Sequence, residues 1–144
     1  MSAPRTFVDT NILVYAYDLS AGEKHEAAKR ALIDLWRNGT GIVNTQVLQE
    51  LYVTLTRKIF KPLETAAALE IVEDMTAWDV VVNDGASILD AARLERRANL
   101  SFWDALIVVA AAKGGAEVLI SEDLPSGRTL EGVRIENPFL EAGK

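Results

Sequence analysis

The most apolar run of the sequence is Leu100-Ser101-Phe102-Trp103-Asp104-Ala105-Leu106-Ile107-Val108-Val109-Ala110-Ala111-Ala112. One charge, Asp104, interrupts it. An ionised carboxylate is costly to bury unless it is paired, hydrogen-bonded or bound to a metal. Ser101 precedes this acid at the capping-box spacing, so Asp104 can also satisfy a backbone N–H at the start of a helix. Helix capping and metal binding by Asp104 can coexist, and the rest of the chain must show whether a metal site is present.

Composition limits the class of protein. The chain has 144 residues, 49% of them hydrophobic, no cysteine and a net charge of −6. We expect a single domain over residues 1–144, without disulfides or thiolate metal sites, in the reducing cytoplasm. The N-terminus lacks a signal-peptide pattern, and no apolar run approaches the roughly 20 residues that span a bilayer, so no membrane partner is expected. The negative charge argues against a nucleic-acid partner unless bound cations offset a carboxylate cluster.

Short strands rich in Val and Ile alternate with amphipathic segments along the whole chain. This pattern predicts an α/β domain of three layers, with a central parallel sheet of about five short strands flanked by helices. The expected strands cover residues 5–9, 41–44, 78–82, 117–121 and 133–136. The expected helices cover residues 12–17, 23–38, 45–59, 63–76, 84–98 (capped by Asn83) and 101–113. Residues 45–76 should form a helical arm, and the tail from about 140 to 144 should fray.

Four acids occupy matching places in this pattern. Asp9 ends the first strand, and Asp123 follows the strand at 117–121. Asp104 lies in the first turn of its helix, and Glu50 lies within the first two turns of another. Ligands of parallel sheets bind beyond the carboxyl ends of the strands, where the helix N-termini gather. All four carboxylates can therefore reach one crevice.

A crevice with four carboxylates requires a counter-charge, because like charges otherwise keep some of them protonated. Hard cations with oxygen ligands, Mg²⁺ or Mn²⁺, suit such a set best. The only histidine, His25, is expected to face solvent and receives no catalytic role. A metal of this kind lowers the pKa of bound water and polarises a phosphoryl oxygen, which is the chemistry of phosphodiester hydrolysis.

Each acid also has a structural interpretation when taken alone. Asp9 could cap the following helix, Glu50 could be a solvated helix residue, and Asp104 could complete a capping box. Asp123 could belong to a solvated loop. The metal-site hypothesis therefore depends on the joint pattern of the four.

That joint pattern resembles the PIN-domain nucleases and, within them, the VapC-type toxins of bacterial type II toxin–antitoxin systems. The stretches that carry the resemblance are residues 7–15 (FVDTNILVY), 46–52 (QVLQELY), 100–107 (LSFWDALI) and 118–124 (VLISEDL). They occur in the family's order over nearly the whole chain. The resemblance implies a PIN-like fold and a cytoplasmic, Mg²⁺- or Mn²⁺-dependent endoribonuclease. It also implies a homodimer and a cognate antitoxin whose basic side chain enters the acidic crevice.

The resemblance assigns roles to residues as well. It makes Asp9, Glu50, Asp104 and Asp123 the catalytic, metal-binding acids. Thr10 or Asn11, together with Ser121, would support them by hydrogen bonds, and Ser121 stands where many relatives have Thr. Glu122 is an additional acid beside the site, and its role stays open.

RNA phosphates also require cations near the crevice. Candidates are Arg57, Lys58, Lys61, Arg93, Arg96, Arg97 and Arg128, although ordinary helix-surface charge is the better explanation for most of them. We expect Trp36, Trp78 and Trp103 to serve the core or an interface rather than to stack on bases.

Two other classes of function compete with the nuclease. A receiver-type phosphoacceptor domain is also small, α/β and acidic, but it needs a lysine after a late strand, where this chain has Ser121. A catalytically silent PIN fold could serve only as an interaction module. The RNA target, the antitoxin, the number of metals and the dimer face are not determined by the sequence.

Overall fold

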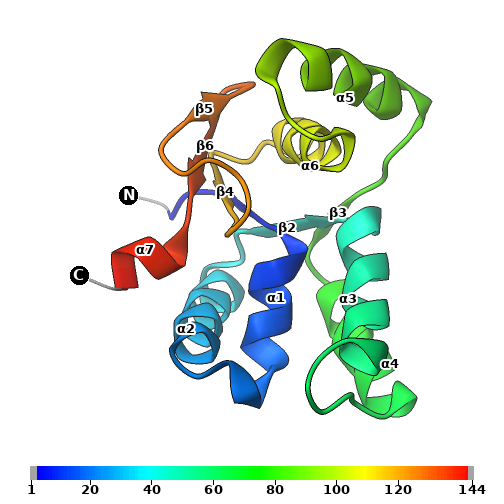
Figure 1. Cartoon of the computed structure of the whole chain (residues 1–144), viewed down its shortest axis with the longest axis vertical. Helices are drawn as coiled ribbons and strands as arrows, with labels where there is room; N and C mark the ends of the chain where they lie inside the picture. Colours follow the sequence, from blue (N-terminus) through cyan, green and yellow to red (C-terminus); the bar gives the residue numbers. More distant parts are fainter. Residues whose placement is uncertain (1–2, 143–144) are drawn as a thin grey trace.

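A six-stranded sheet forms the middle layer of the protein, seen here in a computed structural model that describes residues 3–142 (Figure 1). The strand order is β3-β2-β1-β4-β6-β5, and all pairs are parallel except the β5–β6 hairpin. The predicted α/β class and central parallel sheet are confirmed, with a sixth strand added antiparallel at one edge. The strands are β1 (Thr6–Val8), β2 (Gly41–Asn44), β3 (Asp79–Val81), β4 (Val118–Ile120), β5 (Thr129–Leu130) and β6 (Val133–Glu136).

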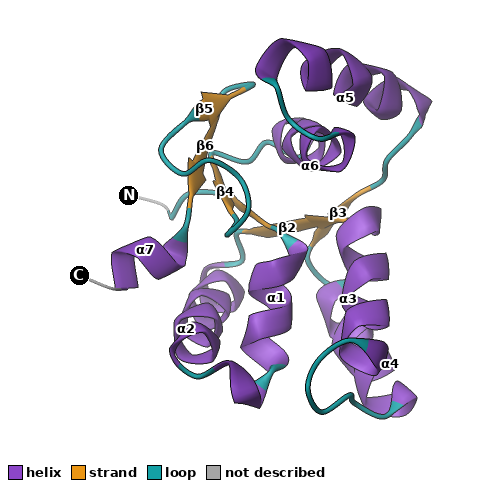
Figure 2. Cartoon of the chain, in the orientation of Figure 1, coloured by secondary structure: helices purple, strands orange, loops and turns teal. Residues whose placement is uncertain are grey.

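Helices cover both faces of the sheet (Figure 2). On one side lie α5 (Gly85–Ala98) and α6 (Phe102–Lys113), which pack on each other. The other side carries α1 (Thr10–Tyr17), α2 (Glu23–Asn38), α3 (Thr45–Arg57) and α4 (Thr65–Met75). A 3₁₀ turn, η1 (Leu19–Ala21), links α1 to α2, and α7 (Pro138–Ala142) follows β6. None of the helices in residues 3–142 has the length and apolar character that crossing a lipid bilayer requires.

The apolar run at residues 100–112 forms most of α6. Six of its twelve residues are buried, and it lies against the sheet through contacts with β2, β4 and β6. The hydroxyl oxygen of Ser101 accepts a hydrogen bond from the backbone N–H of Asp104 at 3.1 Å, so the predicted cap is present. This cap places Asp104 in the first turn, at the end of the helix that faces the carboxyl edge of the sheet.

Several predicted boundaries need correction. Helix α3 ends at Arg57 rather than at residue 59, and α4 runs from Thr65 to Met75 rather than over 63–76. The side chain of Asp84, not that of Asn83, caps α5, because its Oδ1 accepts from the backbone N–H of Ser87 at 2.9 Å. Strand β5 was not predicted, because it is only two residues long and turns sharply into β6.

Two predictions about side chains and termini also differ from the structure. His25 is buried rather than facing solvent, since α2 packs on α1 and the ring Nδ1 lies 2.9 Å from the backbone oxygen of Tyr15. Part of the tail expected to fray over 140–144 instead belongs to α7, and residues 143–144 lie outside the described residues.

The start of β2 illustrates how closely the core is packed. A Cβ added to Gly41 would lie 2.4–2.6 Å from three ring carbons of Trp78. Trp78 is buried and packs edge-on against Trp36, with ring centroids 5.5 Å apart, so its ring has little room to move. The glycine is therefore required by packing.

We predict that Gly41→Ala destabilises the fold by about 1–3 kcal/mol, the usual cost of overpacking a filled core. The matched control is Gly85→Ala at the first residue of α5, where an added Cβ meets nothing within 4 Å. That control should leave stability unchanged or raise it slightly, because alanine favours helix. Urea unfolding of the two variants checks the difference, and equal midpoints would contradict it.

Candidate functional site

The candidate site lies at the carboxyl edge of the two central strands. Asp9 follows β1 and Ser121 follows β4, and these strands pair in parallel with Val8 opposite Ile120. The adjoining hollow has a volume of about 450 Å³, and all four predicted acids line it. We call it the acidic crevice, defined by Asp9, Glu50, Asp104 and Asp123. The structure thus brings together four acids that are up to 114 positions apart in the sequence.

The four acids differ in their exposure to solvent. Asp9 is buried, with only 8% of its surface exposed, and Asp104 is half-buried. Glu50 and Asp123 are exposed. The sequence suggested that Asp104 is the buried acid, but in the structure the buried acid is Asp9. Because Asp104 sits at the end of a helix, its carboxylate avoids the full cost of burial.

Asp9 is held in place by the chain on both sides. One carboxylate oxygen accepts from the backbone N–H of Thr10 at 2.8 Å, which caps α1. The other accepts from the hydroxyl of Ser121 at 2.8 Å. The capping role and the place in the crevice coexist, and the sequence analysis had treated them as alternatives.

Burial raises the pKa of Asp9 from 3.8 to about 6. The hydrogen bonds from Ser121 and Thr10 lower it, but the negative charges of Asp104 and Glu50 raise it further. Desolvation and like charges both disfavour an ionised carboxylate. A cation in the crevice would reverse this effect, because it favours the charged form.

The predicted supporting residues each contact an acid. Thr10 donates its hydroxyl to Glu50 at 3.0 Å. The side-chain amide of Asn11 donates to Asp123 at 2.9 Å. The hydroxyl oxygen of Ser121 accepts from the backbone N–H groups of Asp123 (3.2 Å) and Leu124 (3.3 Å), which shapes the loop after β4. These contacts fit the supporting roles proposed for Thr10, Asn11 and Ser121.

Glu122 is not part of the crevice wall. Its carboxylate accepts a hydrogen bond from the hydroxyl of Tyr15 at 2.8 Å and forms an ion pair with Lys24. Burial pushes the pKa of Glu122 upward, but the bonds from Lys24 and Tyr15 outweigh burial and hold the pKa below its ordinary value. Glu122 is therefore an ionised, paired carboxylate beside the site.

The candidate cations are distributed over different surfaces. Lys58 lines the acidic crevice. Arg93 and Arg97 line a separate hollow beside α5, where Arg93 pairs with Asp90 and Arg97 pairs with Glu131. Arg57 is exposed at the end of α3 and is not among the residues lining the crevice.

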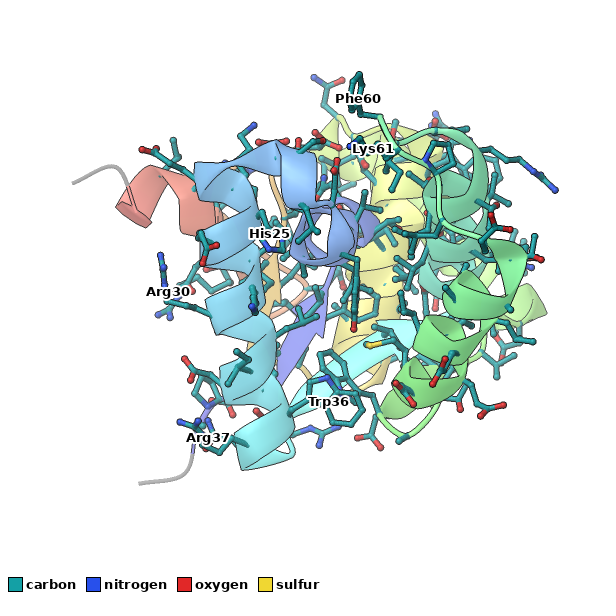
Figure 3. The ribbon with its side chains drawn as sticks, turned by 90° about the horizontal axis from the view of Figure 1, so that it is seen from below. His25, Arg30, Trp36, Arg37, Phe60 and Lys61 are labelled. Carbon is teal, nitrogen blue, oxygen red and sulfur yellow. The ribbon has the colours of Figure 1, made fainter. Side chains whose placement is uncertain are left out.

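Sequence reasoning missed several residues of the crevice wall. Trp103, expected in the core or an interface, is 63% exposed and lines the crevice, so it is not a core residue, and its place in an interface stays a prediction. Phe60 also lines the crevice and is 80% exposed. Figure 3 shows Phe60 projecting from the loop between α3 and α4. The position of Trp103 beside Asp104 was the available signal for it, whereas no local pattern marks Phe60. Trp78, in contrast, is a core residue as expected.

The donor set of the crevice suits Mg²⁺ or Mn²⁺. Its acids offer only oxygen, and the lining residue Gln46 adds a buried side-chain oxygen that accepts no hydrogen bond from any residue in 3–142. Within the same range, no three His, Cys, Asp or Glu side chains already form a cage for a metal ion. Mg²⁺ commonly keeps several waters and is bound through one or two carboxylates together with the phosphates of a substrate.

Comparisons with known proteins agree with this fold. The family model of the PIN domain matches residues 6–124. A toxin–antitoxin complex from Klebsiella pneumoniae contains a chain of similar structure (TM-score 0.68, 20% identity), with 92% of this chain and 97% of that chain covered. VapBC2 from Rickettsia felis, bound to a promoter DNA fragment, gives a TM-score of 0.63 at 22% identity over 92% and 97% of the two chains. No curated protein matches the sequence.

A third similar structure is VapC20 from Mycobacterium tuberculosis, described as a toxin that cleaves the sarcin–ricin loop. Its TM-score is 0.62 at 23% identity, and the match covers 79% of this chain and 86% of that chain. At these identities the three structures establish a shared fold.

The raised pKa of Asp9 predicts how the stability of the metal-free protein depends on pH. A carboxyl whose pKa is higher in the folded state stabilises the fold fully below pH 4, and this contribution is lost as the pH rises through about 6. Asp9→Asn removes the titration and imitates the protonated form. In EDTA at pH 7.5 the variant should therefore be more stable than the parent by up to about 3 kcal/mol, and near pH 4 the two should be similar.

Urea unfolding at both pH values measures the difference. Asp90→Asn on the exposed face of α5 is the control, because it removes the same charge from a residue outside the crevice. If Asp9→Asn is equally destabilising at pH 4 and 7.5, Asp9 serves only as a helix cap.

Proposed function

Since the chain belongs to the PIN domain family, we propose that it is an Mg²⁺- or Mn²⁺-dependent endoribonuclease and the toxin of a toxin–antitoxin pair. The observation that carries this proposal is the acidic crevice, in which four elements contribute one acid each, with the pKa of the buried Asp9 raised to about 6. Such a cluster is unfavourable for the fold, so it requires a ligand that compensates for its charge. A divalent cation is the ligand that its oxygen donors suit.

The structural neighbours support the nuclease part of the proposal. VapC20 is described as a toxin that cleaves the sarcin–ricin loop, and it shares this fold. The Klebsiella and Rickettsia structures are complexes of toxins with antitoxins. A cognate antitoxin is therefore proposed as the partner of this chain. We also propose a homodimer located in the cytoplasm, where cellular RNA is available.

The chain's own residues prepare the crevice for catalysis. Asp9, Asp104, Glu50 and Asp123 would hold the metal, which when bound lowers the pKa of water and offsets the charge of a phosphodiester. Ser121 and Thr10 orient the buried carboxylate of Asp9 before any ligand arrives. Asn11 orients Asp123 in the same way. The free oxygen of Gln46 can accept a hydrogen bond from a water molecule in the crevice.

RNA would lie across the rim of the crevice. Lys58 can contact a phosphate there, and the exposed rings of Trp103 and Phe60 offer faces on which unpaired bases can stack. Trp103 is braced by Phe102, whose ring meets it edge-on with centroids 5.2 Å apart. Arg93 and Arg97, which pair with acids beside another hollow, are weaker candidates for this role.

The two alternatives from the sequence have less support. A receiver-type domain is a different family from the PIN domain that the chain matches. A silent PIN module would retain the fold without needing the four acids to converge. No specific observation favours either alternative over the nuclease.

Asp104→Asn should abolish Mn²⁺-dependent cleavage of RNA while the protein remains folded. The loss should exceed the roughly 10- to 100-fold that removal of an outer-shell partner causes, because Asp104 is proposed to contact the metal directly. Gel assays on a mixed RNA pool, with far-ultraviolet circular dichroism as the fold check, measure this. Asp90→Asn, also on the sheet face that carries α5 and α6, should cleave like the parent. Full activity in Asp104→Asn would remove the basis for the proposal.

Trp103→Ala should raise KM for an RNA oligonucleotide by about 5- to 100-fold, which corresponds to the loss of one stacked base. The value of kcat at saturating oligonucleotide should stay the same. Trp36→Ala is the matched control, because Trp36 is partly exposed and lines a different hollow. A fall in kcat for Trp103→Ala would indicate damage to the site rather than lost stacking.

A further inference from the structure

Among the acids that the structure describes in or beside the crevice, Glu122 alone has both carboxylate oxygens bonded to other side chains. Oε1 accepts from the Tyr15 hydroxyl at 2.8 Å, and Oε2 pairs with the ammonium group of Lys24. The Glu122 side chain is 24% exposed, so these contacts are partly shielded from water. To bind a metal, Glu122 would have to give up at least one of these partners.

The neighbouring acids Glu122 and Asp123 are held by the same face of α1. Asn11 donates to Asp123, and Tyr15 donates to Glu122. Asn11 and Tyr15 are four residues apart, a spacing that places side chains side by side along a helix. The side-chain oxygen of Asn11 also accepts from the backbone N–H of Glu122 at 3.4 Å. One helix therefore holds the loop after β4 at two consecutive residues.

Lys24 extends these contacts to two further helices. Its ammonium group, at the start of α2, lies 5.1 Å from the centroid of the Tyr15 ring and 5.5 Å from that of Phe139 in α7. The rings of Tyr15 and Phe139 meet edge-on with centroids 5.3 Å apart. The cation is thus positioned by two aromatic rings as well as by Glu122, so the pair is better defined than an isolated surface ion pair.

We propose that Glu122 is a positioning residue and not a metal ligand: its contacts with Tyr15 and Lys24 hold the loop that directs Asp123 into the acidic crevice. This inference rests on the proposed function, because it assigns a role relative to the metal that Asp123 would bind. Tyr15 has two roles in this proposal: it lines the crevice, and its hydroxyl donates a hydrogen bond to Glu122.

The inference is tested by a double-mutant cycle of Tyr15→Phe and Glu122→Ala in the full chain. The readouts are the Mn²⁺ dissociation constant from titration calorimetry without RNA, the RNA cleavage rate and the melting temperature. Each single variant should weaken Mn²⁺ binding about tenfold, the lower end of the range for outer-shell partners. The double variant should be no weaker than the poorer single variant, because both changes break the same contact.

Two further variants distinguish positioning from ligation. Glu122→Gln keeps an oxygen for the Tyr15 hydroxyl, so it should bind Mn²⁺ more tightly than Glu122→Ala, whereas a lost metal ligand would make the two equally poor. Tyr17→Phe makes the same chemical change two residues further along α1, where Tyr17 lines a different hollow. It should leave Mn²⁺ affinity unchanged.

Three results would overturn the inference. Multiplicative losses in the cycle would show that Tyr15 and Glu122 act separately. A loss in both Glu122 variants with none in Tyr15→Phe would identify Glu122 as a ligand. Lower melting temperatures with unchanged Mn²⁺ affinity would leave only a structural role.

Failure of the proposed function itself gives a different result, in which the parent protein neither binds Mn²⁺ nor cleaves RNA. Hydrogen exchange at the backbone N–H groups of Glu122, Asp123 and Leu124 then tests the loop directly. All three are bonded to Asn11 or Ser121 in the structure. Exchange about tenfold faster in Tyr15→Phe than in Tyr17→Phe supports the positioning role, and equal rates overturn it.

Discussion

The burial of the Asp9 carboxylate is the constraint on which the rest of the site depends. Strand β1 is buried along its whole length, and Asp9 directly follows it. Asp9 is therefore among the few buried charged or polar residues in the described chain. The backbone of α1 and the hydroxyl of Ser121 supply its two hydrogen bonds, but neither carries a charge. Folding therefore creates a carboxylate that is well oriented and poorly compensated. This is the condition in which binding of a cation brings the greatest electrostatic gain.

Helix α1 organises the other acids around Asp9. Its first two residues hold Glu50 and Asp123, and Tyr15, one turn further on, holds Glu122. About one and a half turns of α1 therefore orient acidic side chains that come from distant parts of the sequence. The hydrogen bonds from neutral donors fix the exposed carboxylates without neutralising them, so the crevice keeps its negative charge.

The rim of the crevice reconciles an acidic protein with a proposed RNA substrate. The net charge of −6 would repel a polyanion, yet Lys58 and the rings of Trp103 and Phe60 lie at the crevice. Stacking on aromatic rings does not depend on net charge. Several other cations are already paired with neighbouring acids, as Arg93 is with Asp90 and Arg97 with Glu131. Because these arginines are paired, fewer basic side chains are available to bind RNA than the number on the helix surfaces suggests.

The sequence by itself determined the alternation of strands and helices, the capped α6 and the four acids at strand and helix ends, because these features follow from local periodicity and spacing. It did not reveal that Asp9 rather than Asp104 is the desolvated acid, since burial depends on which elements cover a residue. The sequence also left Glu122 indistinguishable from its neighbour Asp123, it placed His25 in solvent, and it did not separate the core from an interface for Trp103. Only the tertiary structure decided these points, because the partners concerned, Tyr15 and Lys24 for Glu122 and α1 for His25, come from segments that meet only when the chain folds.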